Sequence, residues 1–304
     1  MIDIAIIGGG PAGLSAGLYA ARGGANVVLF EELFVGGQAA NTHQIDNYPG
    51  FEAGIAGSEL GMKMEQQAAR FGLTVRYQAI QKLELSERAH RIHTAKGVEE
   101  AKTIILAMGA APRPLGLPCE AALTGAGISY CATCDGAFFR NRAVAVAGGG
   151  DTALSDALYL ARFASKVYLI HRRDALRGSA VLQQAVFAEE KIELVWSSVV
   201  TELLGDDVLG GLTVEHVQTK ETRGLDVAAL FVAVGTLPRN ALIKETLACD
   251  AGGYVITDAA MRTSVPGVYA AGDVRNTPLR QVVTAAADGA VAATQALEYL
   301  VTAQ

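Results

Sequence analysis

The hydrophobic positions of this chain gather in short, almost continuous runs that polar and glycine-rich segments separate. The first run, Ile2–Ile7, has the length and composition of a strand that is buried on both faces of a parallel sheet. A helical pattern follows at Leu14–Arg22, and a second short apolar run comes next at Val27–Phe30. This order predicts a strand–helix–strand unit with two parallel strands.

The middle of the chain repeats this order of elements. The pattern predicts a strand at Ala143–Ala147, a helix at Ala153–Phe163 and a further strand at Val167–Ile170. Two such units in one chain predict an α/β fold with two domains.

The remaining pattern divides the chain between these two domains. Further strands are predicted within Leu73–Arg91 and at Thr103–Ala107, Leu230–Val234 and Val268–Ala271, and further helices at Ser58–Phe71 and Arg280–Val301. Pro112, Pro114 and Pro118 interrupt regular structure, so we expect linkers near residues 111–117 and 236–240. The first domain should comprise residues 1–113 and 242–304, and the second domain, inserted into it, residues 114–241.

Charge and composition narrow the classes of partner. The 304 residues carry a formal net charge of −6, which argues against a nucleic acid or a polybasic membrane contact. The apolar stretch Val282–Val301 contains Asp288, Gln295 and Glu298, so it predicts a buried helix rather than a membrane span. The first strand begins at Ile2 and leaves no room for a signal peptide, so we expect a cytoplasmic protein.

A glycine-rich segment connects the first predicted strand to its helix. It places Gly8, Gly10 and Gly13 at the G-x-G-x-x-G spacing of a dinucleotide-binding loop. The first glycine permits a tight turn, the second lets the backbone approach a pyrophosphate, and the third lets the helix pack closely on the strand. Glu31 ends the next strand, where a carboxylate can bind ribose hydroxyls and repels a 2′-phosphate. This loop therefore predicts FAD or NAD rather than NADP.

The second glycine-rich segment, Gly148–Ala153, has the same context but a different ending. No acidic residue ends the strand that follows it, and Arg172, Arg173 and Arg177 lie there instead. Guanidinium groups at this position suit the 2′-phosphate of NADP. A solvated basic surface is the alternative interpretation of the three arginines.

A pair of cysteines, Cys131 and Cys134, lies between the two glycine loops and is followed directly by Asp135. The second cysteine pair or nearby histidine that a zinc site requires is missing from this segment. The spacing favours a reversible redox disulfide over two structural thiols. Asp135 suits either proton exchange with a thiol or a role as a turn or helix-cap residue. We expect Cys119 and Cys249 to take no part.

Taken together, these motifs resemble those of the low-molecular-weight, bacterial-type thioredoxin reductases, over essentially the whole chain. The motifs that carry the resemblance are Gly8–Gly13, Gly36–Gln38, Cys131–Asp135, Gly148–Ala153, His171–Arg173 with Arg177, and Gly272–Asp273 with Arg280–Gln281. The resemblance implies a fold of two nested Rossmann-like dinucleotide-binding domains with three layers. It also implies a homodimeric enzyme that passes a hydride from NADPH to FAD and electrons from FAD to the Cys131–Cys134 disulfide. The resulting dithiol would reduce oxidised thioredoxin by thiol–disulfide exchange.

The resemblance also implies roles for individual residues. FAD would be bound by Gly8, Gly10, Gly13, Glu31, Gly37, Gln38, Asn47, Gly272, Asp273, Arg280, Gln281 and Val282. NADPH would be bound by Gly150, Asp151, Thr152, His171, Arg172, Arg173 and Arg177. Cys131 would attack the partner disulfide, Cys134 would lie nearer the flavin, and Asp135 would be the acid–base residue. Met108 and the segment Arg275–Leu279 depart from the family pattern.

The topology adds a prediction about motion, and the residues leave alternatives open. The cysteines and the presumed NADPH site share the second domain, so both cannot occupy one face of a flavin in the first domain together. We therefore expect the second domain to rotate about the linkers between the half-reactions. The alternatives are a flavoprotein of the same fold that takes electrons from another donor such as ferredoxin, and a dithiol oxidase. Neither needs the three arginines.

Overall fold

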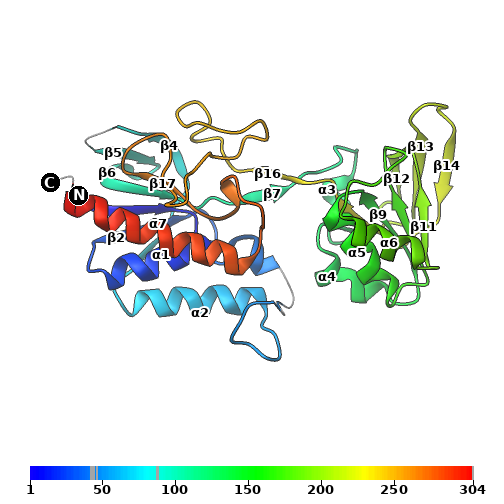
Figure 1. Cartoon of the computed structure of the whole chain (residues 1–304), viewed down its shortest axis with the longest axis horizontal. Helices are drawn as coiled ribbons and strands as arrows, with labels where there is room; N and C mark the ends of the chain where they lie inside the picture. Colours follow the sequence, from blue (N-terminus) through cyan, green and yellow to red (C-terminus); the bar gives the residue numbers. More distant parts are fainter. Residues whose placement is uncertain (42–44, 46, 87–88, 303–304) are drawn as a thin grey trace. The chain divides into compact units, whose positions relative to one another are not determined.

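The computed structural model describes residues 1–41, 45, 47–86 and 89–302, with every side chain in these ranges except that of Cys134. The chain forms two compact units (Figure 1). Unit 1 comprises Met1–Ala111 and Leu237–Gln304, and unit 2 comprises Pro112–Thr236. Unit 2 is therefore an insertion in the sequence of unit 1.

Unit 1 is built on a seven-stranded sheet with the order β3–β2–β1–β6–β5–β4, in which β17 also pairs with β6. The strands are β1 (Ile2–Ile7), β2 (Val27–Glu31), β3 (Thr74–Tyr77), β4 (Ile80–Glu84), β5 (His90–Thr94), β6 (Gly97–Leu106) and β17 (Val268–Ala270). Strands β3, β2, β1, β6 and β17 are parallel, whereas β4, β5 and the first half of β6 form an antiparallel meander. The predicted strands of this unit are confirmed, and β6 begins earlier than predicted.

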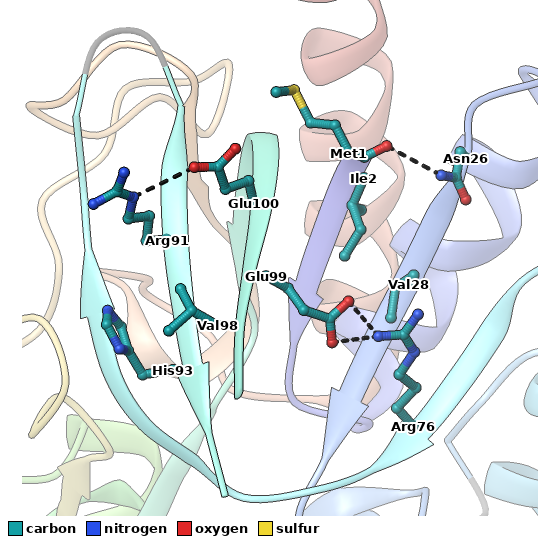
Figure 2. Close-up of a pocket in the computed structure, with 10 residues that line it drawn as sticks. All are labelled: Met1, Ile2, Asn26, Val28, Arg76, Arg91, His93, Val98, Glu99 and Glu100. Atoms are coloured by element: carbon teal, nitrogen blue, oxygen red, sulfur yellow. Dashed lines mark hydrogen bonds and ion pairs between the residues drawn. The ribbon is translucent and has the colours of Figure 1, made fainter. Parts of the chain in front are cut away.

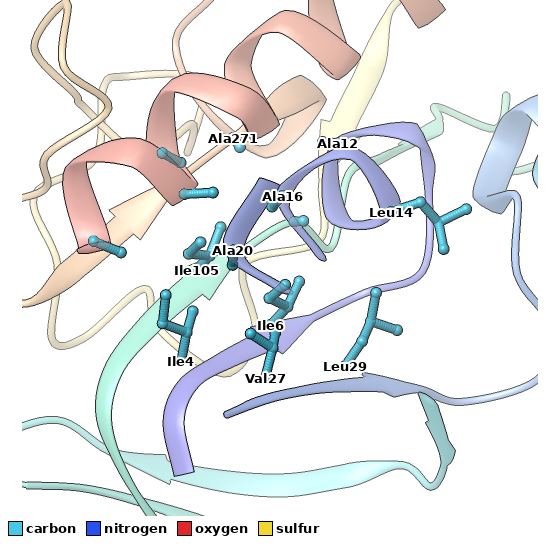
Figure 3. Close-up of a cluster of buried hydrophobic side chains, with 14 of the residues drawn as sticks. Ile4, Ile6, Ala12, Leu14, Ala16, Ala20, Val27, Leu29, Ile105 and Ala271 are labelled. Atoms are coloured by element: carbon cyan, nitrogen blue, oxygen red, sulfur yellow. The ribbon is translucent and has the colours of Figure 1, made fainter. Parts of the chain in front are cut away.

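Three helices, α1 (Pro11–Arg22), α2 (Gly57–Ala69) and α7 (Val282–Thr302), lie together in unit 1 (Figure 1). Ile4 and Ile6 of β1 belong to a core cluster with residues of α1 and α7 (Figure 3). Ala5 and Ile7 belong to a second cluster with the meander and the segment around Ile243. Both faces of β1 are thus covered, which explains an apolar run that only Asp3 interrupts.

The C-terminal helix packs directly on α1. A Cβ at Gly289 would lie 2.0 Å from the carbonyl oxygen of Ala12, so the two backbones touch where only glycine fits. The hydroxyl of Ser15 donates a hydrogen bond to the carbonyl oxygen of Ala286 at 2.7 Å. The predicted helix is therefore confirmed, although it begins at Val282 rather than at Arg280. None of the described helices has the length and apolar character needed to cross a membrane.

Unit 2 repeats the architecture on a smaller sheet. Its five parallel strands have the order β11–β10–β9–β15–β8, and a separate antiparallel sheet has the order β12–β13–β14. The strands are β8 (Ile128–Ser129), β9 (Ala143–Gly148), β10 (Lys166–Ile170), β11 (Ile192–Val195), β12 (Ser198–Leu204), β13 (Gly211–His216), β14 (Thr222–Leu225) and β15 (Ala229–Ala233), and the helices are α3 (Glu120–Leu123), α4 (Ala132–Asp135), α5 (Asp151–Ala161) and α6 (Ala180–Ala188). The predicted β9–α5–β10 repeat and the α/β fold class are confirmed, while α6 and β11 to β14 were not predicted.

The two connecting segments pair with each other. Strand β7 (Ala110–Pro112) and strand β16 (Thr236–Pro238) form a two-stranded sheet, and the N–H of Arg113 donates to the carbonyl oxygen of Gly235 at 2.9 Å. Strand β7 ends at Pro112, and Pro114 and Pro118 lie outside the described strands and helices, as predicted. Proline is tolerated in such an edge strand because the ladder does not require its missing N–H.

Candidate active site

The first glycine loop joins β1 to α1 through close backbone contacts. Gly8 has a φ of +106°, and a Cβ there would lie 2.5 Å from the carbonyl oxygen of Ala107. A Cβ at Gly13 would lie 1.9 Å from the carbonyl oxygen of Gly8. Neither position accepts a side chain, so the first turn of α1 lies directly against the loop. The unpaired N–H groups of this turn are thereby placed where they can bind an anion.

Glu31 ends β2 beside this loop. Its Oε2 accepts a hydrogen bond from the N–H of Gly9 at 2.7 Å, and its Oε1 accepts one from the N–H of Leu33 at 3.1 Å. The carboxylate therefore lies at the carboxyl edge of the parallel strands, next to the glycine loop. This is the place where a ribose of a dinucleotide is bound in such folds.

A hollow of about 400 Å³ lies at this edge of the unit 1 sheet. Ten of the predicted FAD residues line it, namely Gly8, Gly10, Glu31, Gly37, Gln38, Gly272, Asp273, Arg280, Gln281 and Val282. The other two predicted residues lie next to this lining. Gly13 packs against the carbonyl oxygen of Gly8, and Asn47 donates from Nδ2 to Gln281 Oε1 at 2.9 Å. A Cβ at Gly37 would lie 3.0 Å from the Cα of Gly10, so two glycine segments meet backbone to backbone in the wall.

Sequence reasoning missed several residues that line the hollow. Leu33 and Phe34 directly follow the strand that Glu31 ends, and they are 73% and 54% exposed. Two large apolar side chains in a surface loop are a signal that could have identified them. Arg239 also lines the hollow, and its N–H donates to the carbonyl oxygen of Gly109 at 3.0 Å. No sequence pattern connects Arg239 to the glycine loop, because the fold alone brings them together.

The charged residues of the hollow are incompletely paired. Burial raises the pKa of the Asp273 carboxyl; the positive charge of Arg280 opposes this shift, and the negative charge of Asp288 adds to it. The Arg280 guanidinium lies over the ring of Tyr254, 4.2 Å from its centroid. The Nε of Arg280 is buried and has no hydrogen-bond partner among the described residues. A ligand with acceptor oxygens would satisfy this donor.

An ion pair fixes the last glycine segment of the hollow. Asp288 Oδ2 accepts hydrogen bonds from the N–H of Gly272 at 3.1 Å and from Nη1 of Arg275 at 3.0 Å. The side chains of Arg275 and Asp288 are 12% and 13% exposed, and Nε of Arg275 donates to Oγ1 of Thr257 at 2.6 Å. Arg275 belongs to the segment that departs from the family pattern, and its ion pair with Asp288 helps to hold the 3₁₀ turn Gly272–Val274.

A second hollow in unit 1, of about 720 Å³, lies elsewhere (Figure 2). Its walls include Ile2 and Val28, which lie near the amino ends of β1 and β2, away from the glycine loop. Arg76 pairs with Glu99, and Arg91 pairs with Glu100 at 3.4 Å (Figure 2). These charges satisfy one another, so this hollow offers less to a phosphate-bearing ligand than the smaller one does.

We expect Gly13→Ala to weaken both unit 1 and its retention of flavin. The added methyl group meets backbone rather than a flexible side chain, so α1 must move away from the loop, at a cost of about 1–3 kcal/mol or more. The measurements are the flavin-to-protein absorbance ratio after purification and the midpoint of thermal unfolding. Gly224→Ala, whose Cβ would meet nothing within 4 Å, is the control. Wild-type values for both properties in Gly13→Ala would contradict the packing argument.

The second glycine loop, between β9 and α5, is tied to the arginine segment of unit 2. A Cβ at Gly149 would lie 2.3 Å from Nδ1 of His171, so the imidazole packs directly on the loop. The N–H of Arg177 donates to the carbonyl oxygen of Gly149 at 2.7 Å, and Asp151 Oδ1 accepts from the N–H of Ser179 at 2.6 Å. The predicted NADPH residues of the loop and of the arginine segment therefore lie together.

The arginine segment combines positive charge with unmatched donors. His171 is buried, whereas Arg172, Arg173 and Arg177 are exposed. Burial lowers the pKa of His171, and the three nearby guanidinium groups lower it further. Nε2 of His171 has no hydrogen-bond partner in the described part of the chain. Among the residues that the structure describes, no carboxylate forms an ion pair with Arg172, Arg173 or Arg177. This arrangement suits a phosphate-bearing ligand.

The cysteine segment lies in unit 2, where Cys131 directly precedes α4. Cys131 is disulfide-bonded, whereas Cys119 and Cys249 are free. The side chain of Cys134 lies outside the described part of the structure. The described residues contain no group of three or more side chains suited to hold a metal ion. The segment therefore offers disulfide chemistry, in keeping with its spacing.

The hydrogen bonds of Asp135 bear on its two sequence interpretations. Asp135 ends α4, and its side chain makes no capping hydrogen bond to the 3₁₀ turn Gly136–Phe139 that follows. Its Oδ2 instead accepts a hydrogen bond from Oγ of Ser129 at 2.6 Å. Asp135 therefore does not cap this turn, while proton exchange with a thiol and a structural role in the turn both stay predictions. The carboxylate is held next to the cysteine segment, because the same hydroxyl accepts a bond from the N–H of Cys131 at 3.0 Å.

Comparison with known proteins identifies the family. A family model described as pyridine nucleotide-disulphide oxidoreductase matches residues 2–289. The chain belongs to this family, and the resemblance inferred from its motifs is confirmed. Membership makes the chain an oxidoreductase and implies FAD and NADPH as its cofactors.

The relatives that match over the whole chain are more specific. The thioredoxin reductase of Peptoclostridium acidaminophilum is 44% identical over 304 residues, which cover 98% of this chain and 96% of the relative. The crystal structure of Lactococcus lactis thioredoxin reductase in its FR conformation has a TM-score of 0.83 and 42% identity, over 99% of each chain. The crystal structure of a ferredoxin-flavin thioredoxin reductase from Clostridium acetobutylicum has a TM-score of 0.54 and 31% identity, over 99% of this chain and 98% of that one.

Proposed function

We propose that this chain is an NADPH-dependent, FAD-containing thioredoxin-disulfide reductase. The observation that carries the proposal is the composition of unit 2. This one compact unit contains the disulfide-bonded Cys131, the carboxylate of Asp135 beside it, and a glycine loop tied to a segment with three exposed arginines, none of which forms an ion pair with a described carboxylate. The full-length relatives that bear the name thioredoxin reductase support the same conclusion.

The residues of the unit 1 hollow fit FAD. The close packing at Gly8 and Gly13 places the first turn of α1, whose N–H groups suit a pyrophosphate, directly against the loop, and Glu31 offers carboxylate oxygens to a ribose. The unpaired Nε of Arg280 supplies a donor to the bound cofactor. We assign FAD binding to Gly8, Gly10, Gly13, Glu31, Gly37, Gln38, Asn47, Gly272, Asp273, Arg280, Gln281 and Val282. FAD, when bound, supplies two-electron transfer between a hydride donor and a disulfide.

The residues of the second glycine loop fit NADPH. Gly150 precedes the N-terminus of α5, which suits a pyrophosphate, and the exposed guanidinium groups of the arginine segment suit a 2′-phosphate. We assign NADPH binding to Gly150, Asp151, Thr152, His171, Arg172, Arg173 and Arg177. The predicted division into a FAD domain (1–113 and 242–304) and an NADPH domain (114–241) stays a proposal.

The cysteine pair carries the reducing equivalents to the partner. In the reduced protein, the thiolate of Cys131 attacks one sulfur of the thioredoxin disulfide and releases the other sulfur as a thiolate. The thiolate of Cys134 then attacks Cys131, which restores the Cys131–Cys134 disulfide and releases the second thioredoxin sulfur. Two protons accompany the two electrons, and Asp135 is the group in place to move a proton to or from these sulfurs. Thioredoxin leaves as a dithiol.

Three further parts of the proposal follow from the resemblance and the topology. The NADPH site and the cysteines belong to one unit, so the two half-reactions require that unit to change its orientation, and the connecting strands β7 and β16 are where such a rotation is expected. We also propose that the protein functions as a homodimer and in the cytoplasm.

An anaerobic titration tests the proposed function. We expect NADPH to bleach the flavin absorbance of the purified protein rapidly, and NADH to bleach it more slowly. Addition of oxidised thioredoxin should restore the yellow colour, because the dithiol passes its electrons on. Absence of bleaching by both coenzymes would exclude a pyridine nucleotide as the donor. Bleaching without recovery would exclude thioredoxin as the acceptor.

A further inference from the structure

Ser129 is a buried serine next to the cysteine segment. Only 4% of its surface is exposed, and it ends strand β8, which pairs with β15 in the parallel sheet of unit 2. Its register partner on β15 is Phe231, which is also buried. The sheet therefore fixes the backbone of Ser129, two residues before Cys131 in the sequence.

Tyr130, the residue that follows Ser129, is held in place as well. Tyr130 donates from its hydroxyl to Glu120 Oε1 at 2.7 Å, and Glu120 is itself buried. The Glu120 carboxylate also accepts hydrogen bonds from the N–H groups of Leu115 at 2.8 Å and Gly116 at 2.7 Å. The Glu120 carboxylate, held by these backbone hydrogen bonds, anchors Tyr130. Ser129 therefore lies between the paired strand β8 and the anchored Tyr130.

The hydroxyl of Ser129 connects the two reactive groups of the segment. Oγ accepts a hydrogen bond from the N–H of Cys131 at 3.0 Å and lies 2.6 Å from Oδ2 of Asp135. The carbonyl oxygen of Cys131 also lies within reach, at 3.2 Å. A hydroxyl has one proton to donate, and the shorter contact to an acceptor carboxylate takes it. No other hydrogen bond of the Asp135 carboxylate occurs in the described part of the chain.

We propose that Ser129 is a positioning residue for the thiol–disulfide step. By holding Oδ2 of Asp135, its hydroxyl fixes the carboxylate rotamer and leaves Oδ1 to exchange a proton with a cysteine sulfur. The same hydroxyl holds the N–H of Cys131, so carboxylate and sulfur keep one geometry as the bond between sulfurs forms and breaks. The inference rests on the proposed function, since it assumes that Asp135 moves the proton.

The test separates the two half-reactions in Ser129→Ala. We expect kcat for NADPH-dependent thioredoxin reduction to fall about 10- to 100-fold, as for loss of one hydrogen bond to a charged group, with KM for thioredoxin unchanged. The rate of flavin bleaching by NADPH should stay at the wild-type value, because that step does not use Asp135. Ser129→Thr, which keeps the hydroxyl, should recover most of the activity.

A double-mutant cycle shows whether Ser129 acts through Asp135. In an Asp135→Asn background we expect Ser129→Ala to lower kcat less than about 2-fold further, because the carboxylate to be positioned is already absent. Ser198→Ala is the matched control. It removes another buried serine hydroxyl of unit 2, which donates to the carbonyl oxygen of Trp196 at 2.7 Å, and it should leave kcat unchanged.

The outcomes are distinct. Equal losses from Ser129→Ala with and without Asp135 would mean a general structural role, and an unchanged kcat in Ser129→Ala would mean no role, so each overturns the inference and leaves the proposed function standing. A wild-type protein that NADPH bleaches but that does not reduce thioredoxin overturns the proposed function, and the positioning role is lost with it.

Discussion

Cys131→Ser is expected to abolish NADPH-dependent reduction of thioredoxin while NADPH still bleaches the flavin. The thiolate is the attacking group in disulfide exchange, and a serine hydroxyl at this position neither attacks a disulfide nor forms one. We expect the turnover number to fall on the order of 10³-fold or more, as for removal of a nucleophile. Stopped-flow absorbance of the flavin measures the first half-reaction, and a coupled assay with oxidised thioredoxin measures the whole reaction.

The chain offers a matched control in Cys119. It is exposed and free, and it belongs to the same compact unit, so Cys119→Ser changes the same atom type without touching the redox pair. We expect wild-type turnover in Cys119→Ser. Substantial turnover in Cys131→Ser, or loss of turnover in Cys119→Ser, would assign the exchange chemistry to another cysteine.

The sequence was informative where a local backbone requirement leaves a residue signature. The glycine loops are such places, because Gly8 needs a positive φ and Gly13 tolerates no Cβ. The buried runs Ile2–Ile7 and Ala143–Ala147 are others, since parallel strands covered on both faces need continuous apolar residues. The glycine loops and the buried runs together identify both βαβ units, and the two units predict the fold class.

The sequence was less informative where contacts join residues without a local pattern. Helix α4 has only four residues, too few to show a helical period, and α6 and β11 to β14 were left unassigned. Strand β7 has three residues and pairs with β16, which lies far away in the sequence, so no local pattern indicates it. The bond between Ser129 and Asp135 depends on how a turn folds back, and no residue spacing encodes it.

The same limit applies to the walls of the candidate flavin site. Arg239 reaches the hollow only because the chain returns from unit 2 along β16, beside Gly109. The ion pair between Arg275 and Asp288 joins a variant loop to α7, where Asp288 had been interpreted only as a polar interruption of an apolar stretch. Both contacts follow from the topology, which the motif spacing alone does not specify.

Simultaneous replacement of Arg172 and Arg173 by alanine is expected to convert a preference for NADPH into near equality with NADH. Each lost charge-assisted contact to a 2′-phosphate costs about 1.5–3 kcal/mol, or roughly 10- to 150-fold in kcat/KM for NADPH. NADH lacks that phosphate, so its kcat/KM should change only slightly. Steady-state kinetics with both coenzymes and a fixed thioredoxin concentration measure the effect.

This variant also separates the competing sources of electrons. Arg142→Ala is the control, since Arg142 is exposed in the same unit but precedes β9, at the opposite end of that strand from the glycine loop. A structural relative of this chain bears the name ferredoxin-flavin thioredoxin reductase, so a ferredoxin is the alternative donor to be tested. A selective loss with NADPH therefore identifies the three-arginine segment as the site that recognises the 2′-phosphate. Equal losses with both coenzymes would show that it does not. If neither coenzyme reduces even the wild-type flavin, while a reduced ferredoxin does, the three guanidinium groups belong to a solvated basic surface and the donor is a protein.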